Sequence, residues 1–338
     1  MKFIFRFFIV AFVLQLQSCE IHSQSQKING ISLVSSSKKL HNDEVAHIKA
    51  INTNYVAISP FGFIKDMNQP DVQYNLSWQW FGETNAGVEQ YALELKKQGL
   101  GIMLKPQLWV GHGKYTGFIE METEKDWLIL EKSYAAFILN YAQLAEKLKI
   151  PLFCIGTEMK TFVEKKPDYW GKLIVKIRNV YSGKITYAAN WDEVNHLTFW
   201  NQLDMIGIDA YFPLSNSKNP TLAELEKGWE HHKINIKKLA EKYQKPILFT
   251  EFGYRSVNYA TKEPWSSTKI EGEVNLTLQS EALQSLFNQF WSEKWFAGGF
   301  VWKWHANQQE SGGENNNRYT PQNKPAEKLI KAVYLKYQ

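Results

Sequence analysis

Two glutamates stand at the ends of short apolar runs, where they could act as acids, bases or nucleophiles. Glu158 ends the run LFCIGTE at residues 152–158, and Glu251 follows the run ILFT at residues 247–250. An unpaired carboxylate is costly to bury, so acids in such surroundings need a cause. Two carboxylates that face each other can cleave a glycosidic bond, with one as general acid while the other supports the oxocarbenium-like sugar.

The distance between two such carboxyl groups decides the stereochemistry of the cleavage. A separation of about 5–5.5 Å makes the second carboxylate a nucleophile and retains configuration, whereas a clearly wider one gives inversion. The residue types alone leave both outcomes open. A structural alternative is that either glutamate forms a strand-end salt bridge to Lys105.

The elements that must position these acids alternate regularly along the chain. The predicted strands are residues 28–34, 54–61, 101–109, 152–158, 184–191, 204–212, 246–252 and 297–304. The predicted helices are residues 42–51, 84–98, 124–148, 168–181, 194–201, 221–243, 275–293 and 325–336. The strands lack a clean apolar–polar alternation, which is typical of parallel strands buried on both faces. Eight strands, each followed by a helix, predict an α/β fold with a single (β/α)8 TIM barrel.

A doubly wound open sheet is the alternative architecture. Such a sheet normally carries a glycine-rich phosphate-binding turn after its first strand. The turn here reads SLVSSSKK and has no glycine pattern, so dinucleotide binding is unsupported.

Polar and aromatic side chains gather where the predicted strands end, which is where barrel enzymes place their chemistry. In chain order, these residues are Lys105, Gln107, Trp109, Glu158, Asn190, Trp191, Asp209, Tyr211, Glu251, Trp302 and Trp304. They occupy the ends of six successive strands, from the third to the eighth, and simple solvation of strand ends is the weaker explanation. We therefore expect Glu158 and Glu251 to be catalytic and the other side chains to contact substrate.

The N-terminus has the features of an export signal. Residues 1–18 combine Lys2 and Arg6 with a short apolar region, and the ending LQSC resembles a bacterial lipobox. We expect a lipoprotein-type signal peptide, lipidation of Cys19, a tether over residues 19–27 and a catalytic domain over residues 28–338. The protein would then be exported and held in a bacterial envelope by its lipid. An ordinary signal peptide with an incidental cysteine is the alternative.

Composition argues against several other classes of protein. Removing residues 1–18 takes away two positive charges and no negative one, so the formal charge falls from +5 to +3. This balance, without a basic cluster, gives no indication of nucleic-acid binding. The adjacent His231 and His232 cannot face one metal ion from a helix, and a serine nucleophile lacks its Gly-x-Ser-x-Gly turn. No cofactor, no metal and no oligomer is implied.

The segments FCIGTEM, LKPQLWV, IDAYFP and ILFTEFGY together resemble glycoside hydrolase clan A, and within it family 113, the β-1,4-mannanases. The resemblance covers most of residues 28–336. It implies a retaining mechanism with Glu158 as acid/base and Glu251 as nucleophile. It also implies that Tyr211 hydrogen-bonds the nucleophile and that Trp304 forms the floor of the sugar site nearest the cut.

The sequence departs from the clan at a few positions. Thr157 stands where most of the clan has asparagine, as is common in family 113. The second strand lacks the arginine that is frequent elsewhere in the clan, and we expect Lys105 to replace its positive charge. Gln107 stands where relatives often have histidine. The expected activity is endo-cleavage of β-mannan or glucomannan. The alternatives are another clan A β-glycanase, an exo-β-mannosidase, or a non-catalytic glycan-binding lipoprotein.

Overall fold

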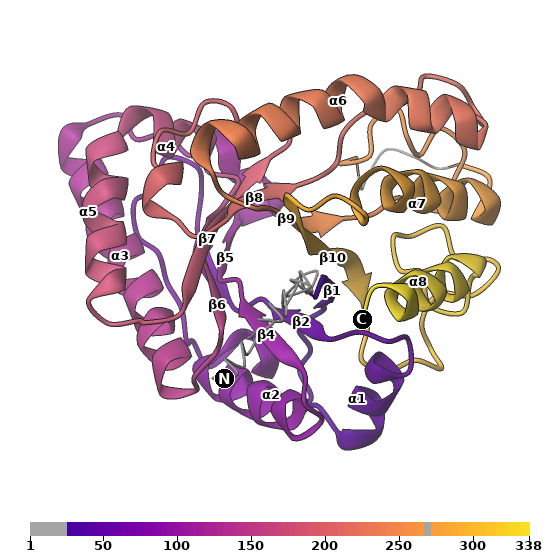
Figure 1. The fold of residues 1–338 in the computed structure, drawn as a ribbon. Coiled ribbons are helices and arrows are strands. Elements are labelled where there is room, and N and C mark those ends of the chain that lie inside the picture. Colours follow the sequence, from indigo (N-terminus) through magenta and orange to yellow (C-terminus); the bar gives the residue numbers. More distant parts are fainter. Residues whose placement is uncertain (1–25, 267–271) are drawn as a thin grey trace, which may run out of the picture.

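The computed structural model describes residues 26–266 and 272–338, so the expected signal peptide and Cys19 lie outside the described residues. The strands of the barrel are β1 (Ile28–Leu33), β2 (Tyr55–Ile58), β4 (Gly101–Leu104), β6 (Leu152–Thr157), β7 (Lys184–Asn190), β8 (Ile206–Asp209), β9 (Ile247–Phe252) and β10 (Phe296–Trp304). They close in the order β1-β10-β9-β8-β7-β6-β4-β2, and every pair is parallel (Figure 1). The single (β/α)8 TIM barrel predicted from the sequence is confirmed.

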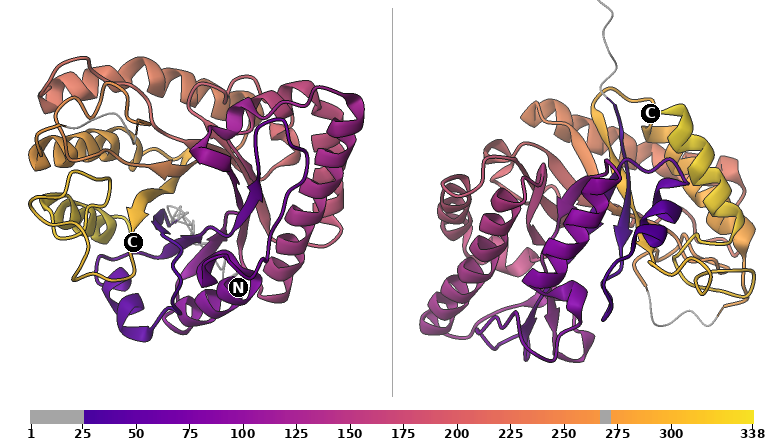
Figure 2. Two further views of the ribbon diagram at one scale, coloured as in Figure 1. Left: turned by 180° about the vertical axis from the view of Figure 1, so that it is seen from behind. Right: turned by 90° about the horizontal axis from the view of Figure 1, so that it is seen from below.

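Helices surround the strands on the outside of the barrel (Figure 2). They are α1 (Asn42–Lys49), α2 (Asn85–Lys97), α3 (Glu124–Lys147), α4 (Lys160–Lys165), α5 (Pro167–Arg178), α6 (Leu222–Tyr243), α7 (Leu276–Phe290) and α8 (Pro325–Lys336). Threonine side chains cap several of them; the hydroxyl of Thr123, for example, accepts a 3.1 Å hydrogen bond from the backbone N–H of Asp126 at the start of α3. No helix in the described ranges has the length and apolarity to span a bilayer.

The helix predicted over residues 194–201 is wrong. The connection from β7 to β8 contains only the 3-10 turn Trp200–Gln202. Phe199 and Trp200 bury their rings there, and Phe199 stacks on Trp170 of α5 at 5.7 Å. The indole of Trp200 donates a 3.0 Å hydrogen bond to the carbonyl of Val194, which closes the loop on itself. Aromatic packing thus replaces a helix on this side.

Two of the predicted strands are each divided in two by a proline. Residues 54–61 give β2 and then β3 (Phe61–Ile64), and residues 101–109 give β4 and then β5 (Gln107–Val110). Pro60 and Pro106 lie at the two breaks, where a residue without an N–H cannot continue a ladder. β3 and β5 pair with each other in a separate two-stranded parallel sheet. This small sheet extends the barrel rim and carries Gln107 and Trp109.

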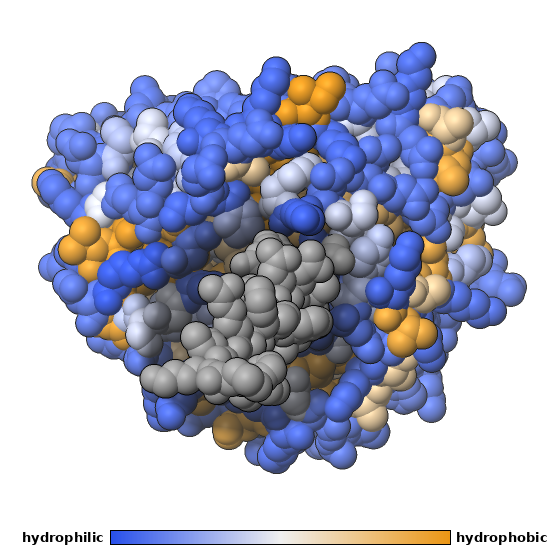
Figure 3. All heavy atoms as spheres, viewed as in Figure 1, coloured by the Kyte–Doolittle hydropathy of each residue, from blue (hydrophilic) through white to orange (hydrophobic). Residues whose placement is uncertain are grey.

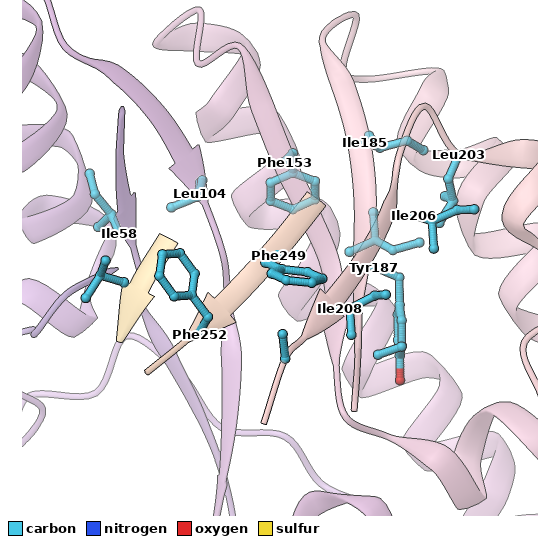
Figure 4. Close-up of a cluster of buried hydrophobic side chains, with 14 of the residues drawn as sticks. Ile58, Leu104, Phe153, Ile185, Tyr187, Leu203, Ile206, Ile208, Phe249 and Phe252 are labelled. Atoms are coloured by element: carbon cyan, nitrogen blue, oxygen red, sulfur yellow. The ribbon is translucent and has the colours of Figure 1, made fainter. Parts of the chain in front are cut away.

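The apolar side chains form two clusters, one between the strands and the helices and one inside the barrel. The inner cluster is small and consists of Ile28, Ala57, Met103, Leu152, Cys154, Ala188, Met205, Leu248 and Phe300. Cys154 is fully buried in it as a free thiol. The outer cluster includes Phe249 and Phe252 of β9 (Figure 4). The surface seen in Figure 3 is mostly hydrophilic, with apolar side chains in separate small patches.

The packed chain begins slightly before the predicted boundary. Lys27, assigned to the tether, is buried, and its ammonium group donates hydrogen bonds to the carbonyls of Glu293 and Phe296. The ordered fold therefore includes the last residue of that segment and closes the barrel beside β10.

Candidate active site

A cleft of about 1180 Å³ opens at the C-terminal ends of the strands. Nine of the expected site residues line it: Gln107, Trp109, Glu158, Asn190, Trp191, Asp209, Tyr211, Glu251 and Trp302. In the right-hand view of Figure 2, the yellow segment between β10 and α8 extends at this end of the barrel. A smaller groove of about 560 Å³ between α3 and α5 contains none of them. The fold thus gathers residues that are up to 195 positions apart in the chain (Gln107 to Trp302).

Glu251 points into the cleft although phenylalanines flank it in the sequence. Phe249 contacts Phe290 of α7 at 4.9 Å, and Phe252 packs on Trp291 at 5.5 Å, so both rings face the helices. The β8–β9 register shifts between Phe249 and Glu251, which places Glu251 opposite Asp209. The carboxylate among phenylalanines is therefore on the opposite side of the strand from the rings.

Three side chains contact the carboxylate of Glu251. The hydroxyl of Tyr211 donates a 2.8 Å hydrogen bond to Oε2, as expected. The amide of Gln107 donates a 3.1 Å hydrogen bond to Oε1, which the ammonium of Lys105 also contacts. Charge-assisted hydrogen bonds of this kind are short and directional, so they fix the orientation of the carboxylate.

Lys105 lies beneath the cleft and does not line it. Its Nζ is 3.1 Å from both carboxylate oxygens of Asp209, and the hydroxyl of Thr250 donates a 2.7 Å hydrogen bond to Oδ1 of Asp209. Burial alone would lower the pKa of Lys105, but the carboxylates of Asp209 and Glu251 outweigh it and raise that pKa. Lys105 is thus a buried counter-ion, and the strand-end salt bridge considered for Glu251 is present.

Glu158 directly follows β6 and has a positive φ of 50°, and its hydrogen bonds within the described residues are all made by its backbone. Burial, followed by the negative charges of Asp209 and Glu251, raises the pKa of Glu158 well above its usual range, with Lys105 opposing. Phe153 of β6 belongs to the cluster that faces the helices. The charge of Asp209, which the sequence reasoning did not consider, acts more strongly than that of Glu251.

Asn190 contacts neighbours other than Glu251 among the described residues. Its amide donates a 2.8 Å hydrogen bond to the hydroxyl of Tyr115, and its backbone N–H donates a 3.1 Å bond to Oε1 of Glu193. Burial raises the pKa of Glu193 to about 8. Tyr115 and Glu193 were missed because neither stands at a strand end; only the acidic pair after Asn190-Trp191 signalled Glu193.

Trp304 is fully buried and does not line the cleft, so its expected place in the floor of the sugar site is wrong. Trp302 lines the cleft instead. Trp302 and Trp304 are two positions apart and would share a face in a regular strand. The β1–β10 register pairs Ile31 with Val301 but Leu33 with Trp304, and this irregularity breaks the alternation.

Aromatic rings form exposed surfaces both inside and outside the cleft. Trp191 stacks on Trp265 at 5.3 Å with an interplanar angle of 23°. Trp265, which the sequence reasoning missed, lies in the segment between β9 and α7 and lines the cleft. Trp78 and Trp80 are 60% and 55% exposed and lie outside the cleft, so they are a surface pair rather than part of this site. Stacked, partly exposed indoles beside carboxylates suit the apolar faces of sugar rings.

No group of three or more histidine, cysteine, aspartate or glutamate side chains in residues 26–266 and 272–338 is arranged to hold a metal ion. What the cleft does offer is one firmly held carboxylate, one carboxyl group that favours its proton, and aromatic walls. This combination can protonate a leaving oxygen and attack the carbon that bears it.

Comparison with known proteins gives a consistent family. A model described as Glycoside Hydrolase Family 113 matches residues 35–324. A GH113 β-mannanase from Alicyclobacillus acidocaldarius, solved in complex with ManMIm, is 23% identical with a TM-score of 0.81, over 93% of this chain and 98% of that one. A second GH113 β-1,4-mannanase complex is 22% identical with a TM-score of 0.79, over 92% and 99%.

A more distant likeness is to a β-glucuronidase from Ruminococcus gnavus in complex with D-glucuronic acid. It is 15% identical with a TM-score of 0.60, over 91% of this chain and 49% of that one. At these identities the three structures show the fold alone. No curated protein matches the chain.

Proposed function

The chain belongs to glycoside hydrolase family 113, and on that premise we propose that it is a retaining endo-β-1,4-mannanase acting on mannan or glucomannan. The observation that carries the proposal is the contrast between the two glutamates in one cleft. Glu251 accepts hydrogen bonds from Tyr211 and Gln107, whereas the carboxyl group of Glu158 has a raised pKa. Environments that hold one carboxylate ionised and keep another protonated are those of a nucleophile and a general acid.

In the proposed first step, the carboxylate of Glu251 attacks the anomeric carbon and forms a glycosyl ester. The glycosidic bond breaks as Glu158 gives its proton to the departing oxygen. In the second step, Glu158 takes a proton from water, and the hydroxide so formed displaces Glu251 and releases the sugar with retained configuration.

Electrostatics explains how Glu158 can serve in both steps. The charge of Glu251 is one of the causes that raise the pKa of Glu158. Esterification of Glu251 removes that charge, so the pKa of Glu158 falls at the moment when it must act as a base. The buried Lys105 keeps its charge throughout and sets the baseline for the change.

The preference for mannan and for endo-cleavage is supported by the solved relatives and by the aromatic lining of the cleft. The two solved relatives above are described as mannanases. The indoles of Trp109, Trp191 and Trp265 line the cleft together with the two glutamates, and a cleft of about 1180 Å³ with several aromatic rings suits a chain of several sugars. Another β-glycanase, an exo-β-mannosidase and a non-catalytic glycan binder remain the alternatives for the test to separate.

The test is a substrate panel with product sizing. Purified protein should release a range of oligosaccharides from mannan and glucomannan and little from xylan or cellulose. Release of single mannose units alone would favour the exo-mannosidase, and binding without turnover would favour the glycan binder. Glu251→Ala should abolish hydrolysis. Added azide should then give an α-glycosyl azide from an activated aryl mannoside, since it can enter the space the carboxylate leaves.

For the location, we propose an envelope lipoprotein anchored through Cys19, as the LQSC ending indicates. Mass spectrometry of the mature N-terminus tests this. A diacylglyceryl-modified Cys19 at the first position supports the anchor, whereas an unmodified Cys19 or cleavage elsewhere contradicts it.

A further inference from the structure

One side of the cleft carries a group of basic side chains that the two-glutamate mechanism does not use. Arg255 follows β9, Lys303 and His305 lie at the end of β10, and Arg318 lies in the segment before α8; all four line the cleft. In the ranges that the structure describes, none of the four forms an ion pair with an acid. We call these four residues the basic wall.

Arg255 is the best-defined member of the basic wall because it is buried with spare donor capacity. Its side chain is 4% exposed, and Nε donates a 3.1 Å hydrogen bond to the carbonyl of Asn317. Its Nη1 is buried and has no hydrogen-bond partner among the described residues. Leaving a buried charged donor unpaired is costly, and the guanidinium fork matches the oxygens of a carboxylate, sulfate or phosphate.

The segment that carries Arg318 is tied firmly to the barrel. The hydroxyl of Ser256 donates a 2.6 Å hydrogen bond to the carbonyl of Asn316. The ammonium of Lys324 donates to the carbonyl of Arg318 at 2.9 Å and to Oδ1 of Asn316 at 3.0 Å. Burial lowers the pKa of Lys324 to about 7. The backbone of this wall is thus fixed before any ligand arrives.

The members of the basic wall act on one another electrostatically. Burial lowers the pKa of Arg255, and the charge of Arg318 adds to this while Tyr319 opposes it. Burial also lowers the pKa of Lys303, where Glu251 opposes the shift and Arg318 adds to it. Burial and the charge of Lys303 lower the pKa of His305. Repulsion of this kind is relieved when an anion enters between the cations.

Lys303 also lies close to the reacting groups. Its ammonium is 5.6 Å from the centre of the Trp302 ring, and Trp302 lines the same cleft as Glu251. The acids Asp192, Glu263 and Glu310 line the cleft too, but none of them pairs with the basic wall within 4 Å. The wall therefore faces the space that a bound sugar would occupy.

We propose that the basic wall binds an anionic substituent of the glycan, so that the preferred substrate is an acidic β-mannan-type chain carrying a carboxylate or a sulfate. The inference rests on the proposed function for the backbone of the substrate and adds the charge of its substituent.

The test compares three β-1,4-linked manno-oligosaccharides of equal length: the neutral chain, the same chain with one C6 oxidised to a uronate, and the same chain with one 6-sulfate. Binding is measured by calorimetry on the Glu251→Gln variant, so turnover is not required. We expect at least one acidic chain to bind about tenfold to a hundredfold tighter than the neutral chain at low salt. The advantage should shrink in 0.5 M NaCl because salt screens the wall.

Arg318→Gln in the same background should reduce that preference about tenfold, since it removes one cation from the wall. Arg318 is exposed, so this change leaves the core intact. Lys238→Gln is the matched control: Lys238 is an exposed residue of α6 outside the cleft, and its loss removes the same charge. A uronate preference without a sulfate preference identifies the substituent as a carboxylate, and the converse identifies a sulfate.

Equal binding of the neutral and both acidic chains would overturn the inference, as would a preference that Arg318→Gln and Lys238→Gln reduce alike. Cleavage of neutral mannan by the wild type, together with no preference for acidic chains, would overturn the basic wall and leave the mannanase proposal standing. Preference for acidic chains without any cleavage of mannan would overturn the mannanase proposal and leave the basic wall standing.

Discussion

Lys105 and Asp209 form a buried ion pair in which the ammonium lies 3.1 Å from both carboxylate oxygens, and the same ammonium contacts Glu251. One cation is therefore shared between two acids at the ends of neighbouring strands. Because Asp209 also raises the pKa of Glu158, the pair connects the proposed nucleophile to the proposed acid. Two of the predictions below follow from this arrangement.

Lys105→Met should destabilise the fold by about 3–5 kcal/mol, because it leaves buried carboxylates without their cation. The loss should grow with pH. Burial already raises the pKa of Asp209 in the folded protein, so protonation of Asp209 favours folding and this contribution is lost as pH rises through that pKa. Removing Lys105 raises the pKa of Asp209 further, so the variant loses more stability than the wild type at high pH.

Urea unfolding of Lys105→Met and wild type at pH 5 and pH 8 measures this difference. Lys238→Met serves as the surface control. An equal loss at both pH values would contradict the coupling between Lys105 and Asp209.

Asp209→Asn should move the alkaline limb of the pH–rate profile to lower pH. The charge of Asp209 is the largest charge effect that raises the pKa of Glu158, so without it Glu158 loses its proton at lower pH. The measurement is kcat/KM of wild type and variant between pH 4 and pH 9. A limb that stays in place would show that another group controls it.

Tyr211→Phe removes the hydroxyl that donates to Oε2 of Glu251. A hydrogen bond to a charged group contributes about 1.5–3 kcal/mol, so kcat/KM should fall about 10- to 100-fold. If the hydroxyl positions the nucleophile, the fall should be in kcat and the melting temperature should change little. Thermal unfolding alongside the kinetics distinguishes this from a general loss of stability.

Trp265→Ala should weaken binding of long oligosaccharides, since it removes one ring of the stacked Trp191–Trp265 pair. A loss of about 1 kcal/mol, or roughly fivefold in KM, is expected from one aromatic contact. Trp78→Ala is the matched control, because Trp78 is similarly exposed but lies outside the cleft. Equal effects of both changes would argue against a sugar-binding role for Trp265.

The barrel could be predicted because each strand is a short apolar run that ends in a polar or aromatic residue. That local signal placed Glu158, Tyr211 and Glu251 at strand ends, and the closed sheet brings them into one cleft. The division of two strands was also visible in principle, since Pro60 and Pro106 interrupt them.

Other features depend on contacts that sequence spacing does not encode. Trp304 was misplaced because a register irregularity in β10 interrupts the alternation of faces. Trp265 and Arg318 were missed because they lie in long irregular segments with no periodicity, and only the folded path brings them to the cleft. The pairing of Lys105 with Asp209 spans 104 positions and likewise follows from barrel closure.

Because of the small β3–β5 sheet, the two sides of the cleft differ in their backbone structure. Gln107 and Trp109 stand on hydrogen-bonded strands, whereas Trp265 and Arg318 stand on connecting segments. Segments without a ladder accept insertions and exchanges more readily than strands do. The cleft thus combines one side held by a strand ladder with another side held by connecting segments. Exchanging residues 306–320 between relatives should therefore change glycan specificity while leaving the two glutamates in place.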